Sequence, residues 1–220
     1  MSERTIIINQ RVTARNDALA ARIRERLARA GVFAVNVLGA PGVGKTSLLT
    51  RLIPLLPLPS SVIEGDIAGE IDTERLRGLG IPTLQINTGG ACHLSASAID
   101  KALAELNPQP GILWIENTGN LICPMEYQIG EHAKLLISNV TEGSDKPYKY
   151  PLAFETADCL VLNKIDLLGP ADFDEEFFTA GARRWNKDAP LFKISAKTGE
   201  GMDEVAGWIS ERAKSVKTSS

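Results

Sequence analysis

The phosphate-loop motif constrains the fold of this chain more than any other feature. GAPGVGKT, residues 39–46, matches G-x-x-x-x-G-K-[ST], follows the apolar run FAVNVL and opens a stretch with helical periodicity. In such a loop the glycines let backbone N–H groups turn inward around phosphate oxygens, and the helix N-terminus adds its positive end. We therefore expect a strand, a nucleotide-phosphate loop and a helix here, rather than a chance glycine-rich turn.

Two side chains of the motif have predicted chemical roles. Lys45 is expected to reach the β- and γ-phosphates, and the Thr46 hydroxyl is expected to ligate Mg²⁺. The nucleotide-binding residues predicted in this loop are Gly39, Gly42, Val43, Gly44, Lys45, Thr46 and Ser47.

Short apolar runs alternate with helical patterns along the rest of the chain. The expected strands cover residues 33–38, 62–66, 83–87, 112–116, 135–140, 159–163 and 191–194. The expected helices cover residues 14–30, 45–55, 72–79, 95–106, 173–185 and 203–214. Strands that alternate with helices imply a mostly parallel β-sheet with helices on both faces. The predicted fold is an α/β P-loop NTPase with a single domain over residues 1–220, an N-terminal extension over 1–30 and a frayed tail over 215–220.

Composition argues against several classes of function. A net charge of -3 over 220 residues argues against a nucleic-acid-binding protein, which usually has a basic excess. The odd number of cysteines, three, suits a reducing compartment rather than a disulfide framework. The N-terminus has no uninterrupted apolar stretch typical of a signal peptide, and no run approaches the roughly 18 apolar residues of a membrane span. We expect a cytoplasmic protein with no membrane or nucleic-acid partner.

Two later motifs predict that the base of the nucleotide is guanine. NKID supplies Asn163, Lys164 and Asp166 after one apolar run, and SAKTGEG begins after the next one. A carboxylate accepts two hydrogen bonds from guanine N1–H and its 2-amino group, whereas adenine would leave the charge unpaired. The pair resembles the base-recognition loops of GTPases, and an alternative is that Asp166 only caps a helix. The residues expected to back the base are Ser195, Ala196 and Lys197.

Carboxylates near the predicted phosphate site are candidates for catalysis and for Mg²⁺. Glu116 opens the stretch E-N-T-G, where small signalling GTPases have D-x-x-G, and no Gln follows the glycine to orient water. We therefore expect a slow intrinsic rate of hydrolysis. Asp66 is the best candidate for the Mg²⁺ shell or for positioning water, while helix capping and function are equally good explanations for Asp72. The predicted catalytic residues are Lys45, Thr46, Asp66 and Glu116, of which Thr46, Asp66 and Glu116 also form the predicted Mg²⁺ shell.

A cysteine and a histidine side by side, Cys92 and His93, indicate a second site. They follow QINTGGA at a predicted strand-to-helix transition, where a helix N-terminus favours a thiolate. Cys123, in the loop after ENTGN, is a third donor, and thiolates with imidazole suit Zn²⁺ or Ni²⁺. The alternatives are small buried hydrophobes for the cysteines and a surface or capping role for His93. Cys159 fits core packing, and His132 has no clear partner.

Several motifs together resemble one family. They are GDIA (65–68), QINTG (85–89) leading into Cys92–His93, ENTGNLICP (116–124) and TEGSDKPYKYP (141–151). With the phosphate loop, NKID and SAKTGEG, they are similar to the hydrogenase nickel-incorporation GTPases, the HypB family of the SIMIBI class, over about residues 36–202.

The resemblance implies a GTP-hydrolysing nickel metallochaperone that binds GTP or GDP with Mg²⁺. It implies that Cys92, His93 and Cys123 hold Ni²⁺, or Zn²⁺ in the same site, where two copies of the motif meet on the two-fold axis of a homodimer. The implied recipients are a partner nickel chaperone and a hydrogenase large-subunit precursor. Lys146 and Lys149 resemble the interface loop of that family, although a solvated surface run is an equally simple explanation.

The chain departs from the family in two places. Its first 30 residues lack the His-rich or Cys-rich tract of many relatives, so nickel storage and a high-affinity N-terminal site are not expected. GEID (69–72) stands where relatives often have a Thr-Asp pair, which leaves the Mg²⁺ shell open. The alternative functions are an accessory GTPase for another metalloenzyme or a regulatory GTPase without metal cargo. A P-loop kinase is disfavoured because NKID and SAK select guanine.

Overall fold

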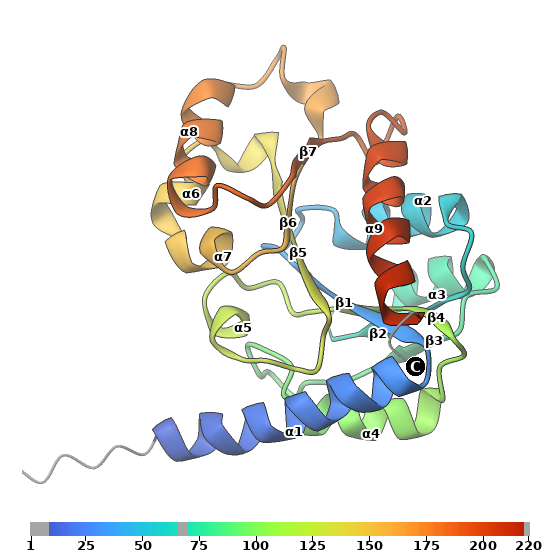
Figure 1. Cartoon of the computed structure of the whole chain (residues 1–220). Coiled ribbons are helices and arrows are strands. Elements are labelled where there is room, and N and C mark those ends of the chain that lie inside the picture. Colours follow the sequence, from blue (N-terminus) through green and yellow to red (C-terminus); the bar gives the residue numbers. More distant parts are fainter. Residues whose placement is uncertain (1–8, 66–69, 218–220) are drawn as a thin grey trace, which may run out of the picture.

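The computed structural model describes residues 9–65 and 70–217, and a single β-sheet crosses the middle of the molecule (Figure 1). Its strand order is β3-β2-β4-β1-β5-β6-β7, and every neighbouring pair is parallel. The strands are β1 (Val32–Leu38), β2 (Ser60–Glu64), β3 (Thr83–Gln85), β4 (Gly111–Glu116), β5 (Ala133–Asn139), β6 (Cys159–Asn163) and β7 (Leu191–Lys193). The predicted α/β P-loop fold with a mostly parallel sheet is confirmed.

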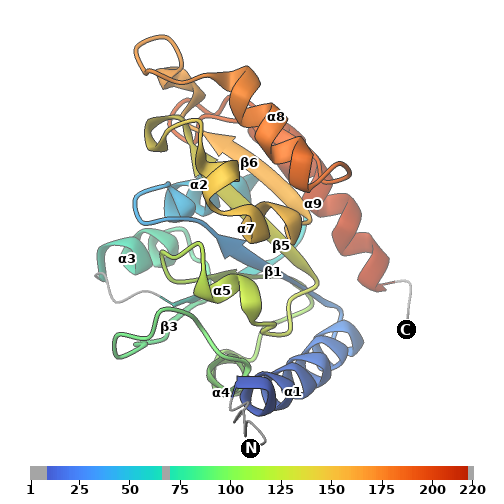
Figure 2. The same ribbon diagram turned by 90° about the vertical axis from the view of Figure 1, so that its left-hand side faces the viewer.

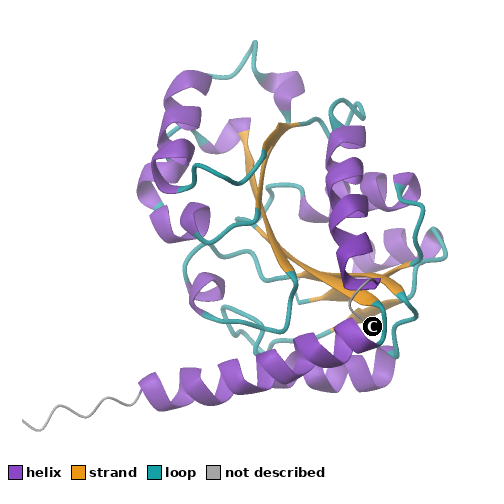
Figure 3. Ribbon diagram, in the orientation of Figure 1, coloured by secondary structure: helices purple, strands orange, loops and turns teal. Residues whose placement is uncertain are grey.

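Helices cover both faces of the sheet, as the orange strands and purple helices of Figure 3 show. They are α1 (Asn9–Arg29), α2 (Lys45–Leu52), α3 (Glu70–Gly78), α4 (Ala96–Leu106), α5 (Cys123–Glu126), α6 (Lys146–Lys149), α7 (Pro151–Glu155), α8 (Glu175–Trp185) and α9 (Met202–Lys217). Short 3₁₀ turns are η1 (Ile53–Leu55), η2 (Val140–Glu142) and η3 (Ile165–Leu167). The one-turn helices α5, α6 and α7 carry too few residues to produce a periodic pattern, and the sequence analysis missed them.

Several element boundaries differ from their predicted positions for identifiable reasons. α2 gives way to η1 after Leu52, because Pro54 lacks the N–H that an α-helix needs. α9 continues to Lys217, into the stretch expected to fray, and Val216 is buried at 8% exposure. α1 begins at Asn9 rather than at residue 14.

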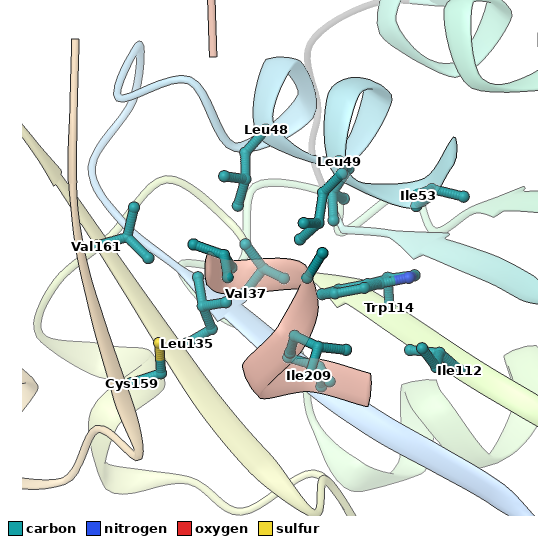
Figure 4. Close-up of a cluster of buried hydrophobic side chains, with 14 of the residues drawn as sticks. Val37, Leu48, Leu49, Ile53, Ile112, Trp114, Leu135, Cys159, Val161 and Ile209 are labelled. Carbon is teal, nitrogen blue, oxygen red and sulfur yellow. The ribbon is translucent and has the colours of Figure 1, made fainter. Parts of the chain in front are cut away.

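The apolar core consists of layers on the two faces of the sheet. On one face, α2 and α9 pack against the central strands, and Figure 4 shows Leu48, Leu49 and Ile209 in one buried cluster with Trp114. Cys159 lies in the same layer, where burial raises the pKa of its thiol well above the ordinary value, in agreement with its predicted packing role.

On the other face of the sheet α1 and α4 lie side by side (Figure 2). Ile23 and Leu27 of α1 are buried against Ile99 of α4 and the inner strands. The helix within the predicted N-terminal extension therefore contributes to the core. None of the helices in the described part of the chain combines the length and apolar character that crossing a membrane requires.

Parallel pairing brings the carboxyl ends of the strands to one edge of the sheet. The phosphate loop follows β1, Glu116 ends β4, Asn163 ends β6, and Ser195 follows β7 by two residues. In open α/β sheets ligands bind in the crevice beyond these strand ends. The register therefore gathers motifs that are far apart in the sequence.

His132 has a structural partner that the sequence did not reveal. Its Nδ1 accepts a hydrogen bond from the Ala34 N–H at 3.0 Å, and its ring stacks on Phe33 with centroids 5.6 Å apart. Burial lowers the pKa of His132 to about 4, and the charge of Arg24 adds to the decrease. The imidazole is consequently neutral at pH 7.

We expect acid to destabilise the fold through His132. Between pH 6.5, the ordinary pKa of histidine, and about 4, the unfolded chain binds more protons than the folded chain, so folding stability falls as the pH falls. From pH 7 to 5 the wild type should lose on the order of 1 kcal/mol more than His132→Asn, which keeps an acceptor but does not titrate. Urea midpoints at both pH values measure this difference, and equal losses in the two proteins would contradict the prediction.

Candidate functional site

The phosphate loop has the backbone shape that its glycines were predicted to allow. Gly42 and Gly44 adopt left-handed φ angles of 71° and 99°. A Cβ at Gly44 would lie 2.6 Å from Asn163 Nδ2, and one at Gly39 would lie 2.8 Å from the Ile137 carbonyl oxygen. A side chain would therefore meet close neighbours at Gly39 and Gly44 and an unfavourable φ at Gly42 and Gly44, so glycine fits these positions best.

Side chains of α2 lie over the loop and beside the end of β4. Lys45, 5% exposed, donates from Nζ to the carbonyl oxygens of Gly39 and Ala40, each at 3.4 Å, so its ammonium lies across the loop mouth. Thr46 Oγ1 donates to Glu116 Oε1 at 3.0 Å. Val43 is buried in the core, whereas Ser47 is exposed.

The Thr46–Glu116 pair fits the chemistry of Mg²⁺. Both residues are nearly buried, at 9% and 4% exposure, and they offer a hydroxyl and a carboxylate, the hard oxygen donors that Mg²⁺ prefers. Asp66 and the Asp72 side chain lie outside the part of the structure that is described, so their predicted roles stay predictions. Glu64 is a carboxylate that the sequence analysis missed: it is 4% exposed and pairs in register with Glu116 on the neighbouring strand. Its signal was its place in VIEGD, two residues before Asp66.

Asn163 joins the loops predicted to bind phosphate and base. Its Nδ2 donates to the Val43 carbonyl at 3.0 Å, and its Oδ1 accepts from the backbone N–H groups of Lys164 at 2.7 Å and Ala196 at 3.1 Å. Lys164, with a left-handed φ of 62°, extends its Nζ to the Gly42 carbonyl at 2.9 Å. The NKID residues therefore hold the phosphate loop in place.

Asp166 faces the SAK loop as the sequence analysis expected. Its Oδ1 accepts from the Ser195 hydroxyl at 2.6 Å, and Lys197 Nζ lies 4.0 Å from its Oδ2. Lys164, rather than Asp166, is the residue that caps η3. The alternative that Asp166 is a helix cap is therefore not supported.

Cys92, His93 and Cys123 come together from the loops after β3 and β4. Cys92 is exposed, with Sγ 3.5 Å from His93 Nδ1, and Cys123 is near enough to raise the pKa of its thiol. His93 stacks on Tyr127 with centroids 4.1 Å apart, a neighbour that the sequence analysis did not identify. Within the described part of the chain, no group of three or more His, Cys, Asp or Glu side chains is arranged to hold a metal ion. The donors are neighbours in one chain without forming a closed coordination site.

The protonation of these donors differs in part from expectation. The hydrogen bond with Cys123 is the main cause that raises the pKa of Cys92, contrary to the predicted effect of a helix N-terminus. The physical reason is position: Ser95 caps α4, so Cys92 lies in the turn before the helix. Burial lowers the pKa of His93, which favours the neutral imidazole that binds metals.

The lysines of the TEGSDKPYKYP stretch form ion pairs within the chain. Lys146 Nζ lies 3.3 Å from Glu142, and Lys149 pairs with Asp145. Their predicted role at an interface stays a prediction.

Comparison with known proteins decides the family. The profile described as CobW/HypB/UreG, nucleotide-binding domain, matches residues 33–193. The hydrogenase maturation factor HypB of Azotobacter vinelandii is 48% identical over 209 residues, which cover 94% of this chain and 69% of that protein. The chain belongs to the HypB family of hydrogenase maturation factors. The probable HypB of Methanocaldococcus jannaschii is 39% identical, with 92% and 93% of the two chains covered.

Solved HypB structures have the same fold as this HypB-family chain. The crystal structure of HypB from Archaeoglobus fulgidus matches with a TM-score of 0.86 and 37% identity, covering 91% of this chain and 99% of that one. HypB from Helicobacter pylori, crystallised in complex with nickel, matches with a TM-score of 0.85 and 33% identity over 91% and 96% of the chains. The sequence-based assignment to the HypB family is confirmed.

We expect Gly44→Ala to weaken nucleotide binding. The added Cβ would push on Asn163 and would place alanine at a φ of 99°, which distorts the loop and costs about 1–3 kcal/mol of strain. GDP affinity measured by calorimetry should fall at least about tenfold, since each 1.4 kcal/mol corresponds to a factor of ten. Gly207→Ala, on the exposed side of α9 with open space around it, is the matched control and should bind GDP normally. Unchanged GDP affinity in Gly44→Ala would contradict the role assigned to this glycine.

Proposed function

We propose that this HypB-family chain is a GTP-hydrolysing nickel metallochaperone that helps to insert nickel into the large subunit of a [NiFe]-hydrogenase. The observation that carries the proposal is the proximity of Cys92 to both His93 and Cys123, on loops that leave the same sheet edge as the phosphate loop. The nickel complex of the Helicobacter pylori relative supports nickel as the cargo. A partner nickel chaperone and the hydrogenase precursor are the proposed recipients.

In the proposed reaction, water attacks the γ-phosphate of GTP directly, with no covalent intermediate. Lys45 and the N–H groups of the loop would hold the β- and γ-phosphates. Thr46 and Glu116 would hold Mg²⁺, which would supply positive charge against the phosphates. Asp66 is proposed to complete the Mg²⁺ shell or to position the water. Asn163, Lys164 and Asp166 select guanine, with the SAK loop behind the base.

The proposed rate of GTP hydrolysis is slow, and the proposed result of hydrolysis is a conformational change. Asn120 follows Gly119, where a water-orienting Gln would stand, and its Oδ1 accepts from the Ile122 N–H at 2.8 Å. The residue is thus used to shape the turn rather than to position water. Hydrolysis would then switch the protein between states of different nickel affinity.

A homodimer completes the proposed cargo site. One chain offers Cys92, His93 and Cys123, and a second copy related by a two-fold axis would double that set. Soft thiolates with a neutral imidazole suit Ni²⁺, and Zn²⁺ is the expected competitor for the same ligands. Since Cys92 must lose its proton to bind a metal, nickel binding should release protons.

Nickel titrations of cysteine variants test the cargo role. With GDP and with a non-hydrolysable GTP analogue, the wild type should bind one Ni²⁺ per subunit or per dimer. The titration measures this stoichiometry, and light scattering measures the mass of the oligomer. Cys92→Ser and Cys123→Ser each remove a proposed ligand. Nickel affinity should therefore fall by more than the roughly 100-fold that disturbing an outer-shell residue costs. Cys159→Ala, in the core, is the matched control. Equal nickel affinity in all four proteins would leave a GTPase without metal cargo as the better account.

We expect Asp166→Asn to weaken guanine recognition. An amide can accept only one of the two hydrogen bonds that guanine N1–H and its 2-amino group offer, and charged hydrogen bonds contribute about 1.5–3 kcal/mol. Competition binding should show that the affinity for GDP falls by roughly 10- to 100-fold. The affinity for xanthosine diphosphate, which has a carbonyl at position 2, should fall less. Asp172→Asn, on an exposed loop of the same region, should bind GDP like the wild type. An unchanged GDP preference would show that Asp166 does not contact the base.

A further inference from the structure

The ring of Tyr127 lies flat against the imidazole of His93, although the two residues come from different loops. Their centroids are 4.1 Å apart and their planes differ by 16°, so the contact is close to a parallel stack. At the edge of the imidazole, Nδ1 lies 3.5 Å from Cys92 Sγ. A stack covers a face of the imidazole, whereas the nitrogen lone pair that binds a metal lies in the ring plane. Tyr127 can therefore hold the ring without blocking its nitrogens.

Buried neighbours on both sides fix the backbone that carries Tyr127. The one-turn helix α5 begins at Cys123, and Met125 within it packs in a buried cluster at 3% exposure. Tyr127 follows the helix with an extended backbone, and Ile129, 1% exposed, packs in a second buried cluster. The half-buried Tyr127 ring is thus attached between two core anchors, on the same short segment as Cys123.

Asn16 of α1 joins the backbone segments that carry the two rings. Its Nδ2 donates to the Gln128 carbonyl oxygen at 2.7 Å, one residue after Tyr127. Its Oδ1 accepts from the Ala96 N–H at 2.9 Å, three residues after His93. One side chain of a helix that belongs to the core therefore sets the separation of the two segments, and the rings meet between them.

The stack restricts a side chain that would otherwise move. Cys92 is exposed and His93 is half-buried, in the turn before α4. A histidine in a surface turn can adopt several rotamers, and a metal that binds its nitrogen must select one of them. Because Tyr127 already restricts the ring, this loss of entropy accompanies folding rather than metal binding.

We propose that Tyr127 is a positioning residue, which holds the imidazole of His93 beside the thiol of Cys92 as a preformed donor pair for the incoming ion. The inference rests on the proposed function and adds to the cargo site a residue that is not a ligand. The flat aromatic ring produces the effect, and the hydroxyl group of Tyr127 does not take part.

Nickel titrations of Tyr127 variants separate the ring from the hydroxyl. Tyr127→Phe keeps the stack and should bind Ni²⁺ as the wild type does. Tyr127→Leu removes the stack and should bind Ni²⁺ about 2- to 12-fold more weakly for each imidazole that holds the ion, the range expected for an aromatic pair. The stoichiometry should not change. Trp185→Leu, which removes a partly exposed ring from α8, is the matched control and should bind like the wild type.

Two results of these titrations would overturn the inference. Equal weakening in Tyr127→Phe and Tyr127→Leu would show that the hydroxyl is a ligand. Wild-type affinity in Tyr127→Leu would show that the ring does not position His93 for the metal.

A second readout needs no metal. The chain has two histidines, so protein labelled with ¹³C and ¹⁵N at histidine shows two imidazoles by NMR, and His132→Asn assigns them. The face of the Tyr127 ring should shift the His93 ring protons upfield in the wild type and in Tyr127→Phe, but not in Tyr127→Leu. The signals of His132, which stacks on Phe33, should stay in place in all three proteins and show that the fold is intact.

The NMR readout separates this inference from the proposed function. If the wild type binds no nickel, but the upfield shift is present and is lost only in Tyr127→Leu, the cargo role fails while Tyr127 still positions the His93 ring. If the wild type binds nickel, but its His93 protons have the shifts of an unstacked histidine, the cargo role stands and the inference is overturned.

Discussion

Parallel pairing of the strands, from β3 at one edge to β7 at the other, is the constraint on which the rest of the molecule depends. Parallel strands need long crossover connections, and the helices in those connections must cover both faces of the sheet. The inner strands β1, β4 and β5 are accordingly buried along their whole length. Because all carboxyl ends point the same way, every polar motif that follows a strand arrives at one edge.

That edge requires polar groups to be buried, and three side chains at the phosphate loop have partners there. Lys45 donates a hydrogen bond to a carbonyl oxygen of the loop, and Thr46 donates one to Glu116. Asn163 donates one to the Val43 carbonyl oxygen. An unsatisfied buried polar group costs about 1–3 kcal/mol, so these contacts are conditions of folding as well as of binding. The same side chains therefore stabilise the folded protein and preorganise a phosphate site.

The side chains proposed to hold nickel are placed differently. Cys92 is exposed, and the neighbouring thiol of Cys123 raises its pKa. His93 stacks on Tyr127, and burial lowers its pKa, which favours the neutral imidazole. These groups lie at a surface, where a second copy of the chain or a protein partner can reach them, and their backbone is attached to the buried Asn117 and Thr118. In the proposed function a rigid interior thus holds an accessible cargo loop.

The sequence by itself determined the fold class, the phosphate loop and the family, because those features are local. GAPGVGKT, NKID and the alternation of apolar runs with helical periods each lie within a few dozen residues. The sequence also identified Glu116, Asp166 and Cys159 in environments that the structure bears out. It missed the short helix α5 at Cys123, because one turn has no periodicity, and it missed the thiol–thiol contact that raises the pKa of Cys92.

Only the tertiary structure decided which distant side chains meet. Asn163 contacts Val43 from 120 residues away, and Asn36 meets Asn117 across 81 residues. Neither contact leaves a local signature, because the sequence around an asparagine has the same composition and periodicity whichever distant residue the side chain contacts. The register of parallel strands, set by burial of both faces of the sheet, fixes those neighbours, and it comes from the packing of the whole chain.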